Sequence, residues 1–118
     1  MASTRVKMTI EWSVPMGQTR PLTSALHSLA ADVRPTRGCV SCSVSSDLAN
    51  RNVVRYVEEW QTESDLRGRV AGDTFGQLVS LMEDAPQPPH IEFVLRRETK
   101  GFEFIEQARE AWTHEQSH

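Results

Sequence analysis

The sequence opens with an alternation that decides how the rest of the chain is interpreted. Residues 6–14 read VKMTIEWSV, so that apolar and polar side chains take turns along this stretch. A period of two residues is typical of a β-strand with one face buried and the other solvated. We therefore predict a strand here, and the length of 118 residues predicts one domain around the sheet that contains it.

Further stretches show the periodicity of a helix or of a strand. They are a helix at 22–33, strands at 39–46 and 53–60, a helix at 62–82 and a strand at 91–96. Pro35 and Gly38 end the first helix, and Gly72 and Asp73 interrupt the second. The order predicts an α+β, ferredoxin-like β-α-β-β-α-β fold, in which a four-stranded antiparallel sheet carries the helices on one face.

The sheet face away from the helices is predicted to be mixed in character. It carries Val53, Val57, Cys39 and Val94 among Arg55, Glu59 and serines. A second copy would cover such a face, so we expect a homodimer, with the two sheets forming a dimeric α+β barrel. We assign residues 1–97 to this domain and 98–118 to a C-terminal extension with a short amphipathic helix, docked on its own core or on the partner.

Composition excludes several classes of protein. Hydrophobic residues make up 38% and charged residues 25%, which is ordinary for a soluble globular domain. No apolar run exceeds three residues, so we expect no membrane span and no export signal. The net charge of −3 argues against nucleic acid as a partner. Two cysteines are too few for a disulfide scaffold and favour a cytoplasmic location.

Residues around the third predicted strand resemble a known family. They are the strand end Val57-Glu58-Glu59-Trp60, then Leu66, Val70-Ala71-Gly72 and Phe75, and the turn Gly38-Cys39 before the second strand. Together they resemble the antibiotic biosynthesis monooxygenase (ABM) family of dimeric α+β barrel proteins, over about residues 6–97. Four positions match the family's strand glutamate and tryptophan and its helix leucine and phenylalanine: Glu58, Trp60, Leu66 and Phe75.

The resemblance implies a function as well as a fold. It implies a cofactor-independent monooxygenase that oxidises a small phenolic or quinol-type substrate with O2, without metal, flavin or haem. Many members have histidines where this chain has Arg69 and Thr74, so haem is not expected. The two missing histidines favour the alternative, a non-catalytic ligand-binding or accessory dimer on the same scaffold.

Glu58 and Arg69 are the candidate catalytic residues. The alternation places Glu58 beneath the helices on one strand face with Tyr56 and Trp60, where desolvation makes a carboxylate a stronger base. Arg69 lies at the edge of the helix's apolar stripe and could stabilise a substrate anion. The structural alternatives are a glutamate bonded to the backbone or to a partner-chain arginine, and an arginine in a surface or interface ion pair.

Aromatic residues are the candidate substrate-binding groups. Trp12, Tyr56, Trp60 and Phe75 could wall a flat apolar pocket for a small aromatic ligand. The alternative is that these rings only fill the core.

Two formal metal or redox motifs are set aside. Cys39 and Cys42 form a C-x-x-C on a strand, where residues three apart are predicted to face opposite ways. His114 and His118 have the spacing of a zinc-binding H-E-x-x-H, but they occupy the last five residues, where chains fray. We therefore predict no metal site.

Overall fold

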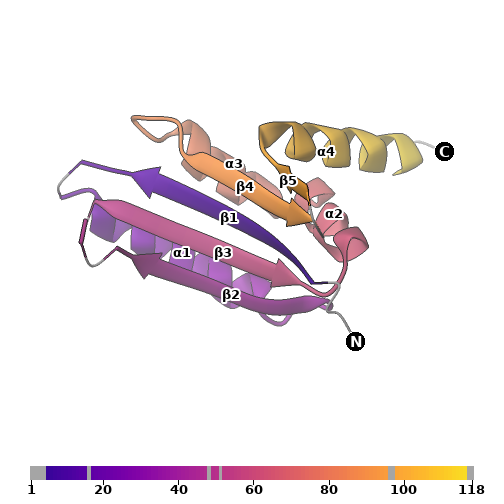
Figure 1. The fold of residues 1–118 in the computed structure, drawn as a ribbon, viewed down its shortest axis with the longest axis horizontal. Helices are drawn as coiled ribbons and strands as arrows, with labels where there is room; N and C mark the ends of the chain where they lie inside the picture. Colours follow the sequence, from indigo (N-terminus) through magenta and orange to yellow (C-terminus); the bar gives the residue numbers. More distant parts are fainter. Residues whose placement is uncertain (1–4, 16, 48, 51, 96–97, 117–118) are drawn as a thin grey trace.

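The alternating stretch at 6–14 forms the central strand of an antiparallel sheet in the computed structural model (Figure 1). The structure describes residues 5–15, 17–47, 49–50, 52–95 and 98–116, with side chains except at 98–100, 103 and 111–116. The elements are β1 (Val6–Ser13), α1 (Thr19–Val33), β2 (Cys39–Ser46), β3 (Val53–Trp60), α2 (Glu63–Ala71), α3 (Phe75–Glu83), β4 (His90–Leu95), β5 (Glu98–Lys100) and α4 (Phe102–Gln116).

The strand order is β2-β3-β1-β4-β5. The first four strands have the order of a ferredoxin-like sheet, so the predicted fold class is confirmed. In the register, Met8 lies opposite Glu58 and Ile10 opposite Tyr56. The prediction of four strands missed β5, which pairs Leu95 with Glu98. A strand of three residues is too short to show a period in the sequence.

The helices lie on one face of the sheet and enclose the core. Figure 1 shows α1 behind β2 and β3, and α3 behind β4. The break predicted at Gly72 is present. The backbone at Gly72 is extended rather than helical, and α3 begins only at Phe75. The largest fully buried side chains between sheet and helices include Trp12, Trp60, Tyr56, Phe75, Phe93 and Phe104.

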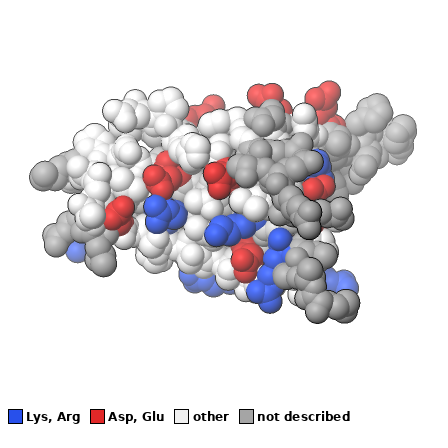
Figure 2. Space-filling view, in the orientation of Figure 1, with Lys and Arg blue, Asp and Glu red and all other residues white. Residues whose placement is uncertain are grey.

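None of the described helices covers the other face of the sheet (Figure 1). Arg55 and Glu11 form an ion pair of 2.8 Å across neighbouring strands there, while Val53 and Val57 are half-buried. Figure 2 shows acidic and basic side chains interspersed on this face, without a field of one sign. The sheet stays open within the chain, so a closed barrel would require a second sheet.

The two cysteines lie on the same face of the sheet, contrary to the prediction. A β-bulge between Cys39 and Ser41 shifts the register, so that Cys39 pairs with Trp60 and Cys42 with Glu58. Since Trp60 and Glu58 are two residues apart, both cysteines face the helices. The prediction assumed a regular alternation along the strand, which does not allow for the extra residue of a bulge. Both cysteines are free thiols.

The extension at 98–118 packs on its own chain through α4. Phe104, Ile105 and Ala108 are buried, and the Phe104 ring lies 4.5 Å from that of Phe93 in β4. Arg109 donates a hydrogen bond of 2.7 Å to the backbone carbonyl of Val70. A cation at the C-terminal end of α2 satisfies a carbonyl that the helix itself leaves free. In the single chain, α4 therefore lies on its own core.

Gly38 is predicted to be intolerant of substitution. Its φ is +91°, and a Cβ there would lie 2.6 Å from the Asp65 carboxyl group. We expect Gly38→Ala to lower the free energy of unfolding by about 1–3 kcal/mol in urea denaturation. Gly76→Ala in α3 is the matched control, because its Cβ would meet nothing within 4 Å and alanine favours a helix. Equal effects of the two variants would contradict the prediction.

Candidate functional site

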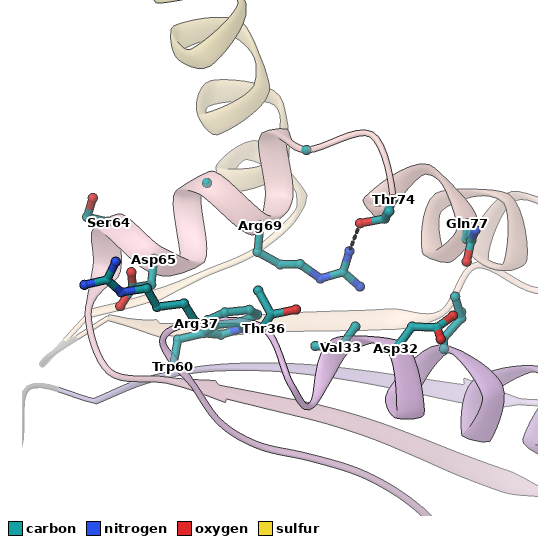
Figure 3. A pocket seen from close by; sticks show the side chains of 13 residues that line it. Asp32, Val33, Thr36, Arg37, Trp60, Ser64, Asp65, Arg69, Thr74 and Gln77 are labelled. Atoms are coloured by element: carbon teal, nitrogen blue, oxygen red, sulfur yellow. Dashed lines mark hydrogen bonds between the residues drawn. The ribbon is translucent and has the colours of Figure 1, made fainter.

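A cavity of about 580 Å³ opens between α1, α2 and the turn that joins α2 to α3. Leu29 and Val33 of α1 give it apolar walls, and the Trp60 ring lies at the end of β3. Figure 3 shows Arg69 extending from α2 towards Thr74, with Asp32 and Val33 of α1 on the opposite side. A volume of this size suits a small organic molecule.

Behind this cavity, the carboxylate of Glu58 is fully buried and is the centre of a polar network. It accepts hydrogen bonds from the Tyr56 hydroxyl at 2.5 Å and from Trp60 Nε1 at 3.0 Å. Arg69 donates to it from Nη2 at 3.0 Å and from Nε at 3.2 Å. Both carboxylate oxygens are thus engaged by donors, as a buried charge requires.

Arg69 links this network to the cavity. Its side chain is only 5% exposed, and its Nη1 donates to the Thr74 hydroxyl at 3.2 Å. Burial alone would lower the pKa of Arg69, but the charge and hydrogen bonds of Glu58 raise it above its ordinary value. The guanidinium also lies 5.2 Å above the Phe75 ring. The cavity therefore has a fixed, permanently charged donor in its wall.

Tyr56 and Cys42 continue the network into the core. The Cys42 thiol donates to the Tyr56 hydroxyl at 3.2 Å. Burial and then the charge of Glu58 raise the pKa of Tyr56, so the phenol stays protonated and donates to the carboxylate. Burial raises the pKa of Cys42 to about 11, and burial also raises that of Cys39. At neutral pH both side chains are thiols and are poor nucleophiles.

The predicted site residues are only partly brought together. Trp60 and Arg69 line the cavity, while Glu58, Tyr56 and Phe75 lie behind it in the core. Glu58 is bonded to an arginine of its own chain, which neither of the sequence interpretations anticipated.

Trp12 lies apart from the other predicted residues. It pairs with Val54, whereas Trp60 pairs with Val6, and six residues of strand correspond to about 20 Å. Trp12 lines a different, smaller hollow. Its indole N–H is the buried side-chain donor for which the described part of the chain offers no acceptor.

Several cavity residues were not identified from the sequence. Thr74 was noted only as a departure from the family pattern, although it lies five positions after Arg69 and accepts its hydrogen bond. Asp32 and Val33 of α1 also line the cavity. In the sequence, Asp32 and Val33 stand out only as the end of an amphipathic helix. Such a pattern indicates which side chains are buried, but not that a cavity lies beside them.

Within the described residues, no group of three or more histidine, cysteine, aspartate or glutamate side chains could hold a metal ion. The side chains of His114 and His118 lie outside that part of the chain. None of the helices in it is long and apolar enough to cross a membrane.

Residues 5–81 match the family model of the antibiotic biosynthesis monooxygenases. The chain belongs to this family. The match ends two residues before α3 does, so β4, β5 and α4 lie beyond the segment that defines membership. Membership of this family supports a monooxygenase-like role in general, but it does not identify a substrate. No functionally curated protein matches the chain.

Solved structures show the same fold. A conserved protein from Methanosarcina mazei has a TM-score of 0.71 at 18% identity, over 80% of this chain and 95% of that one. A Deinococcus radiodurans structure, whose name assigns it to the antibiotic biosynthesis monooxygenases, gives 0.70 and 18%, over 82% and 97% of the two chains. A Bacteroides thetaiotaomicron protein of unknown function, named as a possible oxidoreductase, gives 0.66 and 18%, over 86% and 100%. At this identity the likeness concerns the fold.

Proposed function

We propose that this family member oxidises a small phenolic or quinol-type substrate with O2 in the cavity beside Arg69, without a cofactor. The observation that carries the proposal is the buried guanidinium of Arg69, held by Glu58 and Thr74 in the wall of a cavity to which Leu29, Val33 and Trp60 add apolar surface. A phenolate oxygen next to this donor is stabilised more strongly than in water, because the guanidinium is buried and already held in place by Glu58 and Thr74.

The proposed reaction balances without an added reductant. The phenolate gives electrons to O2, the resulting oxygen species bonds to a ring carbon, and the ring C–H and O–H bonds release their protons. One oxygen atom remains on the ring as a carbonyl and the other leaves as water. The substrate supplies all the electrons and becomes a quinone.

In this proposal, Arg69 stabilises the substrate anion and Glu58 accepts its proton. Glu58 can do so only when the substrate takes the place of one of its present donors. Of these donors, Trp60 and Arg69 line the cavity. Since Arg69 has to stay to stabilise the anion, Trp60 is the donor that the substrate would displace. Tyr56 and Phe75 support the pair from behind, while Trp12 belongs to a separate hollow.

One observation favours the second candidate, a ligand-binding or accessory protein without catalysis. The donors around Glu58 already satisfy both carboxylate oxygens, so the carboxylate stabilises Arg69 whether or not a reaction follows. A site of this kind can bind an aromatic anion and leave it unchanged.

Oxygen uptake and tryptophan fluorescence separate the two candidates. With a panel of naphthols and quinols, we expect consumption of one O2 per substrate, formation of the quinone, and quenching of Trp60, which lines the cavity. The matching naphthalenes without a hydroxyl group should give no uptake. Quenching without uptake would support the ligand-binding candidate, and the absence of both would reject the cavity as the site.

A pair of neighbouring variants assigns these signals to the cavity. Asp32 and Ala31 are both exposed on α1, but only Asp32 lines the cavity. Asp32→Phe should fill the cavity and reduce both quenching and uptake at least about tenfold, while Ala31→Phe should leave them unchanged. Equal effects would show that the signals arise elsewhere.

We further propose that the protein acts as a cytoplasmic homodimer. The support for the dimer is the uncovered sheet face, where half-buried valines lie among charged pairs. The free thiols of Cys39 and Cys42 are in keeping with a reducing compartment. Sedimentation equilibrium, with Val57→Lys as the interface variant, measures the oligomeric state directly.

A further inference from the structure

A second hollow, of about 530 Å³, lies between α3, the proline-rich connector before β4, and the first turns of α4. Its walls are mainly apolar and are formed by Val79, Met82, Pro86, Pro89, Phe102 and Ile105. It shares no lining residue with the cavity at Arg69. The hollow is therefore a separate candidate site.

Phe102 gives this hollow an accessible aromatic wall. Phe102 is 46% exposed, which makes it the most exposed large apolar residue in the part of the chain that the structure describes. Two residues further along α4, Phe104 is fully buried. The same helix thus uses one phenylalanine for the core and presents the other beside an apolar hollow, where a ligand could cover it.

Among the side chains that the structure describes, the charged groups at this hollow are of one sign. Glu83 comes from α3 and Glu106 from α4, and none of the described lysines or arginines joins them in the lining. Both are exposed, and neither has an ion-pair partner among the side chains that the structure describes. Figure 2 shows acidic side chains along the edge of the molecule where α4 lies. A ligand that complements this lining therefore carries a positive charge.

We propose that the hollow binds an organic cation with an apolar, aromatic body. The body fills the space between α3 and α4, and the ammonium group lies near Glu83 and Glu106. The Phe102 face adds a cation–π contact, which aromatic rings offer to ammonium groups. Because the hollow shares no lining residue with the cavity at Arg69, its test does not rest on the proposed oxidation.

The test compares three naphthalenes of the same size and different charge. The ligands are 1-naphthylmethylammonium, 1-naphthalenemethanol and 1-naphthoate, titrated into the full chain in low-salt buffer at pH 7 and followed by backbone amide shifts. We expect the ammonium to bind about five- to tenfold more tightly than the alcohol, the carboxylate to bind most weakly, and added salt to reduce the difference. The shifts should concentrate at residues 79–83 and 102–106.

Exposed glutamates supply a matched set of variants. Glu106→Gln should reduce the preference for the cation, and Glu83→Gln with Glu106→Gln should abolish it while leaving the alcohol's affinity unchanged. Glu110→Gln makes the same charge change in α4, but Glu110 is not part of the lining, so the preference should persist. Phe102→Ala should weaken the binding of all three ligands.

Three results would overturn the proposal. The first is an alcohol that binds as tightly as the ammonium, which would make the hollow merely apolar. The second is a cation preference that survives in the double glutamine variant. The third is amide shifts confined to the cavity at Arg69, with no change at residues 79–83 and 102–106.

Discussion

Arg69→Ala is expected to lower the free energy of unfolding by about 3–5 kcal/mol, because it leaves a buried carboxylate without its cation. Glu58 is fully buried, and Arg69 supplies the positive charge beside it at 3.0 Å. Tyr56 and Trp60 would still donate hydrogen bonds, but neither carries a charge. Urea denaturation followed by circular dichroism measures the loss.

Arg67→Ala is the matched control in the same helix. Arg67 pairs with Glu63 at 3.0 Å and lies 4.6 Å from the centre of the Phe104 ring, but its side chain is 37% exposed, so solvent screens both interactions. We expect a change of about 1 kcal/mol or less. Equal losses in the two variants would mean that the Glu58 and Arg69 pair does not support the fold.

A double variant separates the charge from the packing. Glu58→Gln combined with Arg69→Met removes both charges while keeping similar volumes, and it should recover much of the loss seen in Arg69→Ala. Turnover is best measured in Arg69→Lys, which keeps the cation but loses the forked donor geometry. Unchanged turnover in a folded Arg69→Lys protein would show that the charge suffices without the forked geometry. Unchanged turnover in the folded double variant, which has no cation at this position, would remove Arg69 from the proposed chemistry.

The burial of Glu58 could be predicted from the sequence, whereas its partner could not. The alternation along β3 placed Glu58 on the same face as Tyr56 and Trp60, and the register confirms this face. Arg69 lies eleven residues further on, at the edge of a helix. Sequence periodicity indicates which way a side chain faces, but not which charged group it meets across the helix–sheet interface.

Position along a strand is the second feature that periodicity does not supply. Trp12 and Trp60 share a face of the sheet, which supported their prediction as walls of a common pocket. The antiparallel register places them at opposite ends, with Trp12 beside Val54 and Trp60 beside Val6. The wrong prediction for Cys39 and Cys42 has a similar cause. The bulge adds one residue to β2, and that residue shifts those that follow it to the opposite face of the sheet.

The cavity depends on a segment that lies outside the family match. Arg69 is the first residue of the last turn of α2, and the next residue, Val70, has its carbonyl bonded by Arg109 of α4. The α2 helix is short and ends at Ala71, so few contacts of its own hold it in place. By packing along α2, α4 supports the position from which Arg69 reaches the cavity.

Phe104→Ala is accordingly expected to lower the free energy of unfolding by about 3–5 kcal/mol in urea denaturation. The Phe104 ring is fully buried, lies 4.5 Å from Phe93, and has the Arg67 guanidinium 4.6 Å above its centre. Its removal leaves a cavity between α4, α2 and β4, and we expect α2 and the Arg69 site to lose order with it.

Phe102→Ala is the control for this prediction, because it makes the same substitution two residues away. Phe102 is 46% exposed, so its loss should change the free energy of unfolding by less than about 1 kcal/mol. A small effect of Phe104→Ala would show that α4 is an appendage that unfolds independently. A large effect confined to Phe104 would show instead that residues beyond the family match belong to the same cooperative unit as the cavity, because the core that positions Arg69 would then extend into α4.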